Sequence, residues 1–278
     1  MIFRCQKAIR SLSQQVLVRH IFSENKMNEQ GYRVSELYTG KDKGIYGKLY
    51  RPEGTGKKPL LIFSHELFCT HTTGDDYGKL LAPYGIALYT FDFRNGSHWG
   101  KSGNDMMKMS VKTEYEDLAE ILDDAGDWEW VDRERIFLAG ASQGGFVSGM
   151  LAIDMQERIA GLIGLYPAFL LHDVIHRTFQ DDRTRIEDIN SYSPWFTGGR
   201  CYAEDIWDYD IYERMNGFAK PVLLIHGDRD PLVDFRWSVR ATQSFPDARL
   251  EVIHGSGHGF SGDALKKACL LIKEMIER

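Results

Sequence analysis

The chain has 278 residues, 43% of them hydrophobic, and a formal net charge of −6. This length and apolar content suit one large α/β domain with a sizeable core. The acidic balance disfavours a nucleic-acid-binding surface, and no segment approaches the roughly 20 consecutive apolar residues of a membrane-spanning helix.

The first 26 residues are basic and poor in acids, unlike the rest of the chain. Their apolar residues suit a basic amphipathic helix, but no unbroken apolar core precedes a small-residue cleavage site, which disfavours a secretory signal. An organelle presequence fits the composition. We favour an extension upstream of a start at Met27. This predicts a cytoplasmic domain over residues 27–278 and leaves organelle import through residues 1–26 as the alternative.

The first two strand patterns, residues 32–39 and 44–51, are separated by a short glycine-containing segment and predict an antiparallel hairpin. Strands and helices then alternate, which is typical of parallel strands joined by right-handed crossovers. The sequence therefore predicts an α/β fold with a mostly parallel, eight-stranded sheet and helices on both faces. The further strands are expected at 59–64, 86–92, 135–140, 160–166, 221–227 and 249–254, and the helices at 75–84, 114–130, 143–157, 232–244 and 262–277.

The interval over residues 168–220 breaks this alternation and is too long for a simple connection between elements. We expect a small insertion there rather than a second independent domain. The insertion is rich in aromatic residues, namely Trp195, Phe196, Tyr202, Trp207, Tyr209 and Tyr212.

The segment Gly140-Ala141-Ser142-Gln143-Gly144 follows a continuous apolar run and precedes a helical pattern. This G-x-S-x-G pattern suits a serine on a very tight turn between a strand and a helix, because larger side chains two positions away would collide with the backbone. The context makes Ser142 a candidate nucleophile.

The two partners that a serine nucleophile needs each follow a predicted strand of their own. Asp230 stands in the loop after residues 221–227, and His258 stands in a glycine-rich loop after residues 249–254. The order serine, aspartate, histidine is the one expected of an α/β-hydrolase triad. The alternatives to Asp230 are Asp228 and Asp234, and the histidines interpreted as structural are His226 and His254.

On these features the chain resembles α/β-hydrolases of the serine esterase type, and more narrowly the bacterial cinnamoyl (feruloyl) esterase group. The resemblance spans about residues 30–278 and implies the α/β-hydrolase fold, with residues 168–220 as a cap over the active site. The segments that carry the narrower resemblance are Ser64-His65, Tyr89–Gly96, Gly140–Val147, Leu165–Ala168 and Asp205–Tyr212.

The resemblance assigns a role to each candidate. Ser142 needs a base during attack because its hydroxyl is protonated at neutral pH, and His258 has the titration range for that role. Asp230 would orient the imidazole and stabilise its charged form. The backbone N–H groups of Gln143 and Leu67 would form the oxyanion hole.

Glu66 stands where the family has a glycine in the oxyanion loop. An ionised carboxylate aimed at a developing negative charge would oppose catalysis. We therefore expect the Glu66 side chain to point away from the oxyanion hole or to meet a cation.

The aromatic residues of the predicted cap indicate an apolar, partly aromatic acyl pocket. Packing of the cap onto the domain is the alternative role for such residues. The candidates for substrate contact are His65, Trp195, Trp207 and Tyr209.

The four cysteines, Cys5, Cys69, Cys201 and Cys269, form no C-x-x-C pair and no histidine-rich spacing. We expect free thiols, no metal site and no other cofactor.

The predicted function is hydrolysis of a small carboxylic ester through an acyl-enzyme intermediate, with hydroxycinnamoyl esters as candidate substrates. A serine peptidase or an acyltransferase would use the same residues. A catalytically silent binding protein with a hydrolase fold is the alternative from another class. The oligomeric state stays open, with a homodimer among the options.

Overall fold

The structure is a computed structural model in which residues 26–27 and 31–278 are described. Apart from Lys26, the predicted N-terminal extension lies outside the described residues, as does Cys5. Within this described part, no helix is long and apolar enough to cross a membrane.

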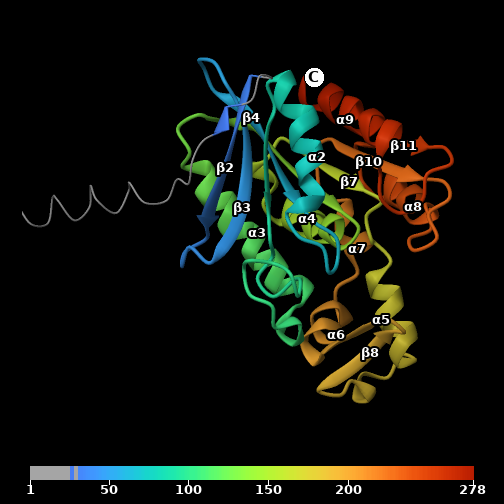
Figure 1. Ribbon diagram of the computed structural model, residues 1–278. Helices are drawn as coiled ribbons and strands as arrows, with labels where there is room; N and C mark the ends of the chain where they lie inside the picture. The colour runs from blue at the N-terminus through green and yellow to red at the C-terminus, as the bar shows by residue number, and fades with distance from the viewer. Residues whose placement is uncertain (1–25, 28–30) are drawn as a thin grey trace, which may run out of the picture.

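A nine-stranded sheet forms the centre of the described molecule, in the order β1-β2-β3-β5-β4-β6-β7-β10-β11 (Figure 1). The pairings from β1 to β5 are antiparallel, and those from β5 to β11 are parallel. This confirms the predicted mostly parallel sheet, to which β1 adds a two-residue edge strand. The strands are β1 (Lys26–Met27), β2 (Tyr32–Thr39), β3 (Ile45–Pro52), β4 (Lys58–Ser64), β5 (Ala87–Phe91), β6 (Val131–Ala141), β7 (Gly161–Leu165), β10 (Val222–Gly227) and β11 (Ala248–Ile253).

The five predicted helices are present, with three shifted starts, of which the first is at Thr72 instead of residue 75. The helix predicted at 114–130 begins earlier, at Val111, because Ser110 Oγ accepts a hydrogen bond from the N–H of Thr113 and closes a capping box. The helix predicted at 232–244 begins later, at Arg236, because Asp230 and Asp234 hold the preceding residues in turns. The helices are α2 (Thr72–Leu81), α3 (Val111–Gly126), α4 (Gln143–Asp154), α8 (Arg236–Ser244) and α9 (Gly262–Ile276), with short 3-10 turns η1 (Ala82–Tyr84), η2 (Met106–Lys108) and η3 (Gln156–Arg158).

Separate apolar cores lie on the two faces of the sheet, and alternate residues of β4 serve each of them. Leu61 and Phe63 pack into the core that α2 and α9 cover. Leu60 and Ile62 pack into the core that α3 and α4 cover. A strand buried on both faces has no polar side, which explains the continuous apolar runs in the sequence.

The chain between β7 and β10 leaves the sheet and folds beside one end of it, at the bottom of Figure 1. We call residues 168–220 the cap. Ser110 at the start of α3 donates to Asp205 in the cap at 2.5 Å, which ties the cap to the sheet-covering helices. The cap consists of α5 (Leu171–Phe179), η4 (Arg183–Arg185), the antiparallel hairpin of β8 (Ile189–Ser193) and β9 (Phe196–Gly199), α6 (Arg200–Trp207) and α7 (Ile211–Met215).

The predicted triad and oxyanion-hole residues lie just after β4, β6, β10 and β11. These strands are parallel, so their carboxyl ends meet at one edge of the sheet. In open α/β sheets this edge is where ligands bind.

Candidate active site

Ser142 occupies a strained turn between β6 and α4. Its backbone has φ 51° and ψ −117°, a conformation that costs a residue with a side chain free energy and is held only by tight surroundings. Its N–H donates to the carbonyl of Leu165, and its carbonyl accepts from Ala168, so β7 and the residues after it hold the turn on both sides.

The glycines around Ser142 are required by close backbone contacts. A Cβ atom at Gly140 would overlap the backbone of Gly144, and one at Gly144 would overlap the carbonyls of Ser64 and His65. A side chain at Gly140 would force the turn itself open, and one at Gly144 would push the turn away from the end of β4. This is the physical basis of the G-x-S-x-G pattern in this chain.

Asp230 is the carboxylate that contacts His258. Nδ1 of His258 donates to Oδ2 of Asp230 at 2.7 Å, and the carboxylate side chain is fully buried. The two alternatives are engaged elsewhere. Asp228 accepts from His254 and from a backbone N–H in the next loop, and Asp234 accepts from the N–H of Arg236.

The buried Asp230 carboxylate is stabilised in its ionised form. Burial by itself raises its pKa, but hydrogen bonds from His226, His258 and the N–H groups of Val233 and Leu232 outweigh burial and hold the pKa well below its usual range. His226, interpreted as structural, lies beneath Asp230 and bridges Ser238 and Val233. An ionised, immobile acceptor is what an orienting carboxylate requires.

Ser142 and His258 line one cavity of about 490 Å³ between the sheet edge and the cap. The two predicted oxyanion donors, Gln143 and Leu67, line it as well. The rest of the wall is mostly apolar. It comes from the loop after β7, from α5, from the β8–β9 hairpin and from the Asp230 loop, and its apolar members include Leu170, Leu171, Val174, Ile175, Tyr192, Phe196, Leu232 and Val233.

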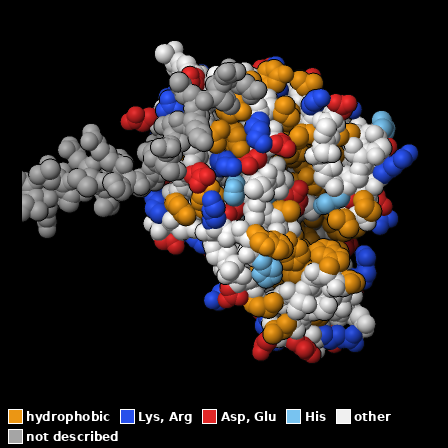
Figure 2. Space-filling view, in the orientation of Figure 1, with side chains coloured by type: hydrophobic (Ala, Val, Ile, Leu, Met, Phe, Trp, Pro, Cys, Tyr) orange, Lys and Arg blue, Asp and Glu red, His pale blue; other side chains and the backbone are white. Residues whose placement is uncertain are grey.

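Hydrophobic side chains also gather on the surface where the cap meets the rest of the domain (Figure 2). Trp195 and Leu232 both line the cavity and are 63% and 58% exposed. They form an exposed apolar rim of the cavity.

Of the four predicted substrate contacts, the structure brings only Trp195 to the cavity. His65 is buried, with Nδ1 donating to the carbonyl of Glu66 and Nε2 accepting from the N–H of Phe93. It therefore orders the loop after β4, and burial lowers its pKa.

The other two predicted contacts pack the cap. The Trp207 ring lies against His176 in α5 at 4.4 Å between centroids, and Tyr209 lies against Phe146 of α4. Neither side chain lines the cavity. Trp207 and Tyr209 therefore have the packing role that was the alternative to substrate contact, since large rings also fill the junction between two packed layers.

The sequence interpretation missed the wall that α5 provides. Leu171, Val174 and Ile175 face the cavity at the i, i+3, i+4 spacing of an amphipathic helix. That spacing is a signal in the sequence, but nothing local to it says that the apolar face meets a cavity rather than a core.

Comparison with known proteins assigns this arrangement to a family. The model described as the prolyl oligopeptidase family matches residues 77–271, a range that contains Ser142, Asp230 and His258. The chain belongs to the prolyl oligopeptidase family. A search of the curated proteins finds no match.

Solved structures share the fold of this family member at low sequence identity. Est1E from Butyrivibrio proteoclasticus, with ferulic acid bound, matches with a TM-score of 0.76 and 20% identity over 92% of this chain and 100% of that one. The acetyl xylan esterase from Paenibacillus sp. R4 matches with a TM-score of 0.68 and 18% identity over 96% of this chain and 92% of that one. A monoacylglycerol lipase from Paleococcus ferrophilus matches with a TM-score of 0.62 and 17% identity over 84% and 98%. The likeness confirms the predicted α/β-hydrolase fold, and the Est1E match agrees with the resemblance to the feruloyl esterase group.

Glu66 in this family member lies on the cavity wall and binds two hydroxyl groups. Oε2 accepts from Thr73 at 2.8 Å, and Oε1 accepts from Tyr166 at 2.9 Å. Both partners are hydroxyl groups, so the alternative in which Glu66 meets a cation is wrong. The bonds tie the loop after β4 to Tyr166, whose ring lies against His258 at 4.7 Å between centroids.

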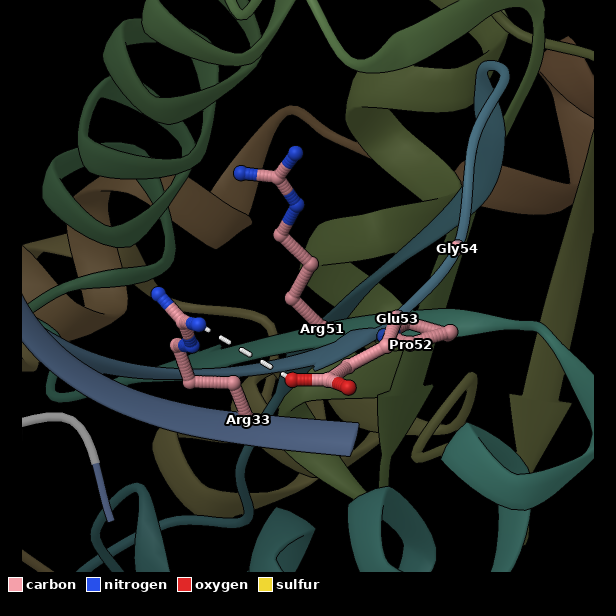
Figure 3. Close-up of a pocket in the computed structure, with 5 residues that line it drawn as sticks. All are labelled: Arg33, Arg51, Pro52, Glu53 and Gly54. Carbon is pink, nitrogen blue, oxygen red and sulfur yellow. Dashed lines mark ion pairs between the residues drawn. The ribbon is translucent and has the colours of Figure 1, made fainter. Parts of the chain in front are cut away.

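A second pocket, of about 220 Å³, lies at the edge of the sheet in β2 and β3 (Figure 3). Arg33 and Glu53 form an ion pair of 3.8 Å across it, while Arg51 extends away from that pair. No predicted site residue lines this pocket. Among the described residues, no group of three or more histidine, cysteine, aspartate or glutamate side chains is placed to hold a metal, and Cys69, Cys201 and Cys269 are free thiols.

Glu114 is a buried acid beneath the site that sequence interpretation did not single out. It is 1% exposed and accepts a hydrogen bond from the Gln143 side chain at 2.9 Å. Burial raises its pKa to about 8, with a further contribution from Asp117 on the same helix. The folded protein therefore keeps Glu114 protonated at neutral pH, whereas the unfolded chain ionises it near 4.5.

This shift predicts a pH-dependent gain in stability for Glu114→Gln. Between pH 4.5 and about 8 the folded state binds the proton that the unfolded state has lost, so wild-type stability falls as the pH rises through this window. Glutamine mimics the protonated acid and removes that loss. We expect equal stability near pH 4, and a variant more stable by up to about 5 kcal/mol at pH 8, from about 1.4 kcal/mol per pKa unit.

Urea unfolding of both proteins across this pH range measures the difference. Asp117, whose pKa burial raises to about 6 despite its pairing with Arg94, titrates in both proteins, and its charge enters the comparison through its contribution to the Glu114 pKa. A difference between the two proteins that does not change with pH would contradict a protonated Glu114.

Proposed function

We propose that the protein is a serine hydrolase that cleaves carboxylic esters through an acyl-enzyme intermediate. The observation that carries the proposal is the convergence of Ser142 and His258 on one apolar cavity, with His258 held by the buried, ionised Asp230. The strained turn at Ser142, which presents the side chain ahead of α4, supports the same role.

In the proposed reaction, Nε2 of His258 removes the hydroxyl proton of Ser142 as Oγ attacks the ester carbonyl carbon. The carbonyl oxygen becomes an oxyanion that the backbone N–H groups of Gln143 and Leu67 stabilise. The tetrahedral intermediate collapses, the C–O bond to the alcohol breaks, and the proton on His258 passes to the leaving alkoxide. His258 then deprotonates a water molecule that attacks the acyl carbon, the C–O bond to Ser142 breaks, and the proton on His258 returns to Ser142 Oγ as the acid leaves.

The cavity wall supports an apolar acyl group as the part of the substrate that enters. Its volume of about 490 Å³ lies in the usual range for small-molecule sites. The phenol groups on its wall are already engaged, since Tyr192 donates to the carbonyl of Gly199 and Tyr202 donates to Gln143. Aliphatic acyl groups and the ring of a hydroxycinnamoyl group are both compatible with this lining.

A panel of esters tests the proposal. We expect kcat/KM to rise by up to about fourfold for each added acyl methylene, because burial of a methylene contributes about 0.8 kcal/mol, until the cavity is full. Feruloyl and cinnamoyl methyl esters, which differ in their ring substituents, report whether the wall recognises the phenol. Equal turnover of acetyl and octanoyl esters would contradict an apolar acyl pocket.

A serine peptidase is the second candidate, because the matching family model carries the name prolyl oligopeptidase. An aminoacyl amide in the same panel discriminates the two. The ester proposal expects the matched ester to be cleaved far faster than the amide. Faster cleavage of a prolyl amide than of any ester would favour the peptidase.

A further inference from the structure

The side chain of Gln143 is bonded at both ends of its amide. Nε2 donates to Oε2 of Glu114 on α3 at 2.9 Å, and Oε1 accepts from the hydroxyl of Tyr202 on α6 at 2.8 Å. Gln143 is 2% exposed. The residue after Ser142 is therefore held between a helix of the sheet layer and a helix of the cap.

Both anchors are buried, and Tyr202 is held in place by its neighbours. Tyr202 is 3% exposed, and its ring lies against those of Tyr192 and Phe196 at 4.9 and 4.8 Å between centroids. Those two rings line the cavity beside Tyr202. The helix that carries Tyr202 is tied to the start of α3 through the hydrogen bond from Ser110 to Asp205. Tyr192, Phe196 and Tyr202 form the aromatic part of the cavity wall, which we call the acyl-binding wall. The hydrogen bond from Tyr202 connects this wall to the Gln143 side chain.

The position of Gln143 matters because its backbone N–H belongs to the first turn of α4, where N–H groups have no acceptor within the helix. Such a donor stabilises an oxyanion only when it lies about 2.7–3.1 Å from the charge. Backbone hydrogen bonds from Gly145, Phe146 and Ala168 hold the Ser142 carbonyl of the 142–143 peptide, so a further restraint on its N–H is one that acts from the Gln143 side. An anchored side chain supplies that restraint.

We propose that Tyr202 and Glu114 are positioning residues that clamp Gln143 from two sides, orient its backbone N–H toward the developing oxyanion, and link the acyl-binding wall of the cap to that donor. The inference rests on the proposed ester hydrolysis. Because the clamp acts on a group that binds charge only in the transition state, its loss lowers kcat and leaves KM nearly unchanged.

Tyr202→Phe tests the cap side of the clamp, because it removes one hydroxyl and keeps the ring. We expect kcat for the best ester to fall about 10- to 100-fold, the range for a misplacement of about 1 Å in a reacting site, with KM within about twofold of wild type. Tyr115→Phe is the matched control. It removes a phenol hydrogen bond between α3 and α4 that goes to Asp154, away from the cavity, and is expected to leave kcat unchanged.

Substitutions of Glu114 test the other side. Glu114→Gln keeps an oxygen that accepts from Nε2 of Gln143 and is expected to retain wild-type kcat. Glu114→Leu keeps the bulk, removes the acceptor, and is expected to match Tyr202→Phe. The double variant should lose less than the product of the two single losses, because both act through Gln143.

Affinity for phenylboronic acid, which forms a tetrahedral adduct with a serine nucleophile, is expected to fall in step with kcat in Tyr202→Phe and Glu114→Leu. Thermal unfolding checks that each variant is folded. Wild-type kcat in both variants, or a loss confined to KM, would overturn the clamp and leave ester hydrolysis standing. Failure of the wild-type protein to turn over any ester and to bind the boronic acid would overturn both.

Discussion

Ser142→Ala is expected to lower kcat for the best ester by about 10⁴- to 10⁶-fold, since the losses measured for removal of a serine nucleophile reach this size. The variant keeps His258, Asp230 and the oxyanion donors, but no group remains to form the acyl-enzyme. A small residual rate from substrate binding and the oxyanion hole is expected. Initial rates at saturating ester measure the loss.

A fluorophosphonate probe measures the same residue without a substrate. The wild-type protein is expected to be labelled covalently, and Ser142→Ala is expected to show no labelling. Ser148→Ala is the matched control, because Ser148 lies on the same helix and its hydroxyl bonds to Ser64 and to a backbone carbonyl of β6. Labelling that persists in Ser142→Ala, or that is lost in Ser148→Ala while the protein is folded, would sink the nucleophile assignment.

Asp230→Asn is expected to lower kcat by about 10⁴-fold with little change in KM. The amide retains the shape of the carboxylate, but it no longer stabilises the imidazolium and it favours the wrong tautomer of His258. The carboxylate is ionised throughout the range in which the enzyme would work, because its hydrogen bonds hold the pKa well below the usual value. No recovery of the variant is therefore expected at any pH between 5 and 9.

Asp228→Asn is the matched comparison, two residues away. Asp228 bonds to His254, whose side chain is 83% exposed, and to the N–H of Gly255. This variant is expected to keep kcat within a few-fold of wild type, since exposed pairs contribute little. Thermal unfolding separates lost chemistry from lost folding. Full activity in Asp230→Asn together with inactivity in Asp228→Asn would reverse the assignment.

The sequence by itself was sufficient wherever the cause is local. Gly140 is required by a contact within the turn itself, so this part of the pattern around Ser142 carries its own explanation, whereas Gly144 faces the carbonyls of Ser64 and His65 from another strand. The alternation of buried residues in β4 follows from a strand covered on both faces, which makes the strand visible as an apolar run. The parallel sheet and the helices that cover it were predictable for this reason.

Interactions between distant segments were decided only by the tertiary structure. Three aspartates within seven residues carry the same chemistry, and only the approach of the His258 loop shows that Asp230 contacts it. Glu66 meets a hydroxyl 100 positions away, and Glu114 and Tyr202 reach Gln143 from separate helices. The same holds for the cavity wall, where α5 and the β8–β9 hairpin, rather than Trp207 and Tyr209, face the site. A sequence pattern records which face of an element is apolar, but the packing of whole elements determines whether that face covers a core or lines a cavity.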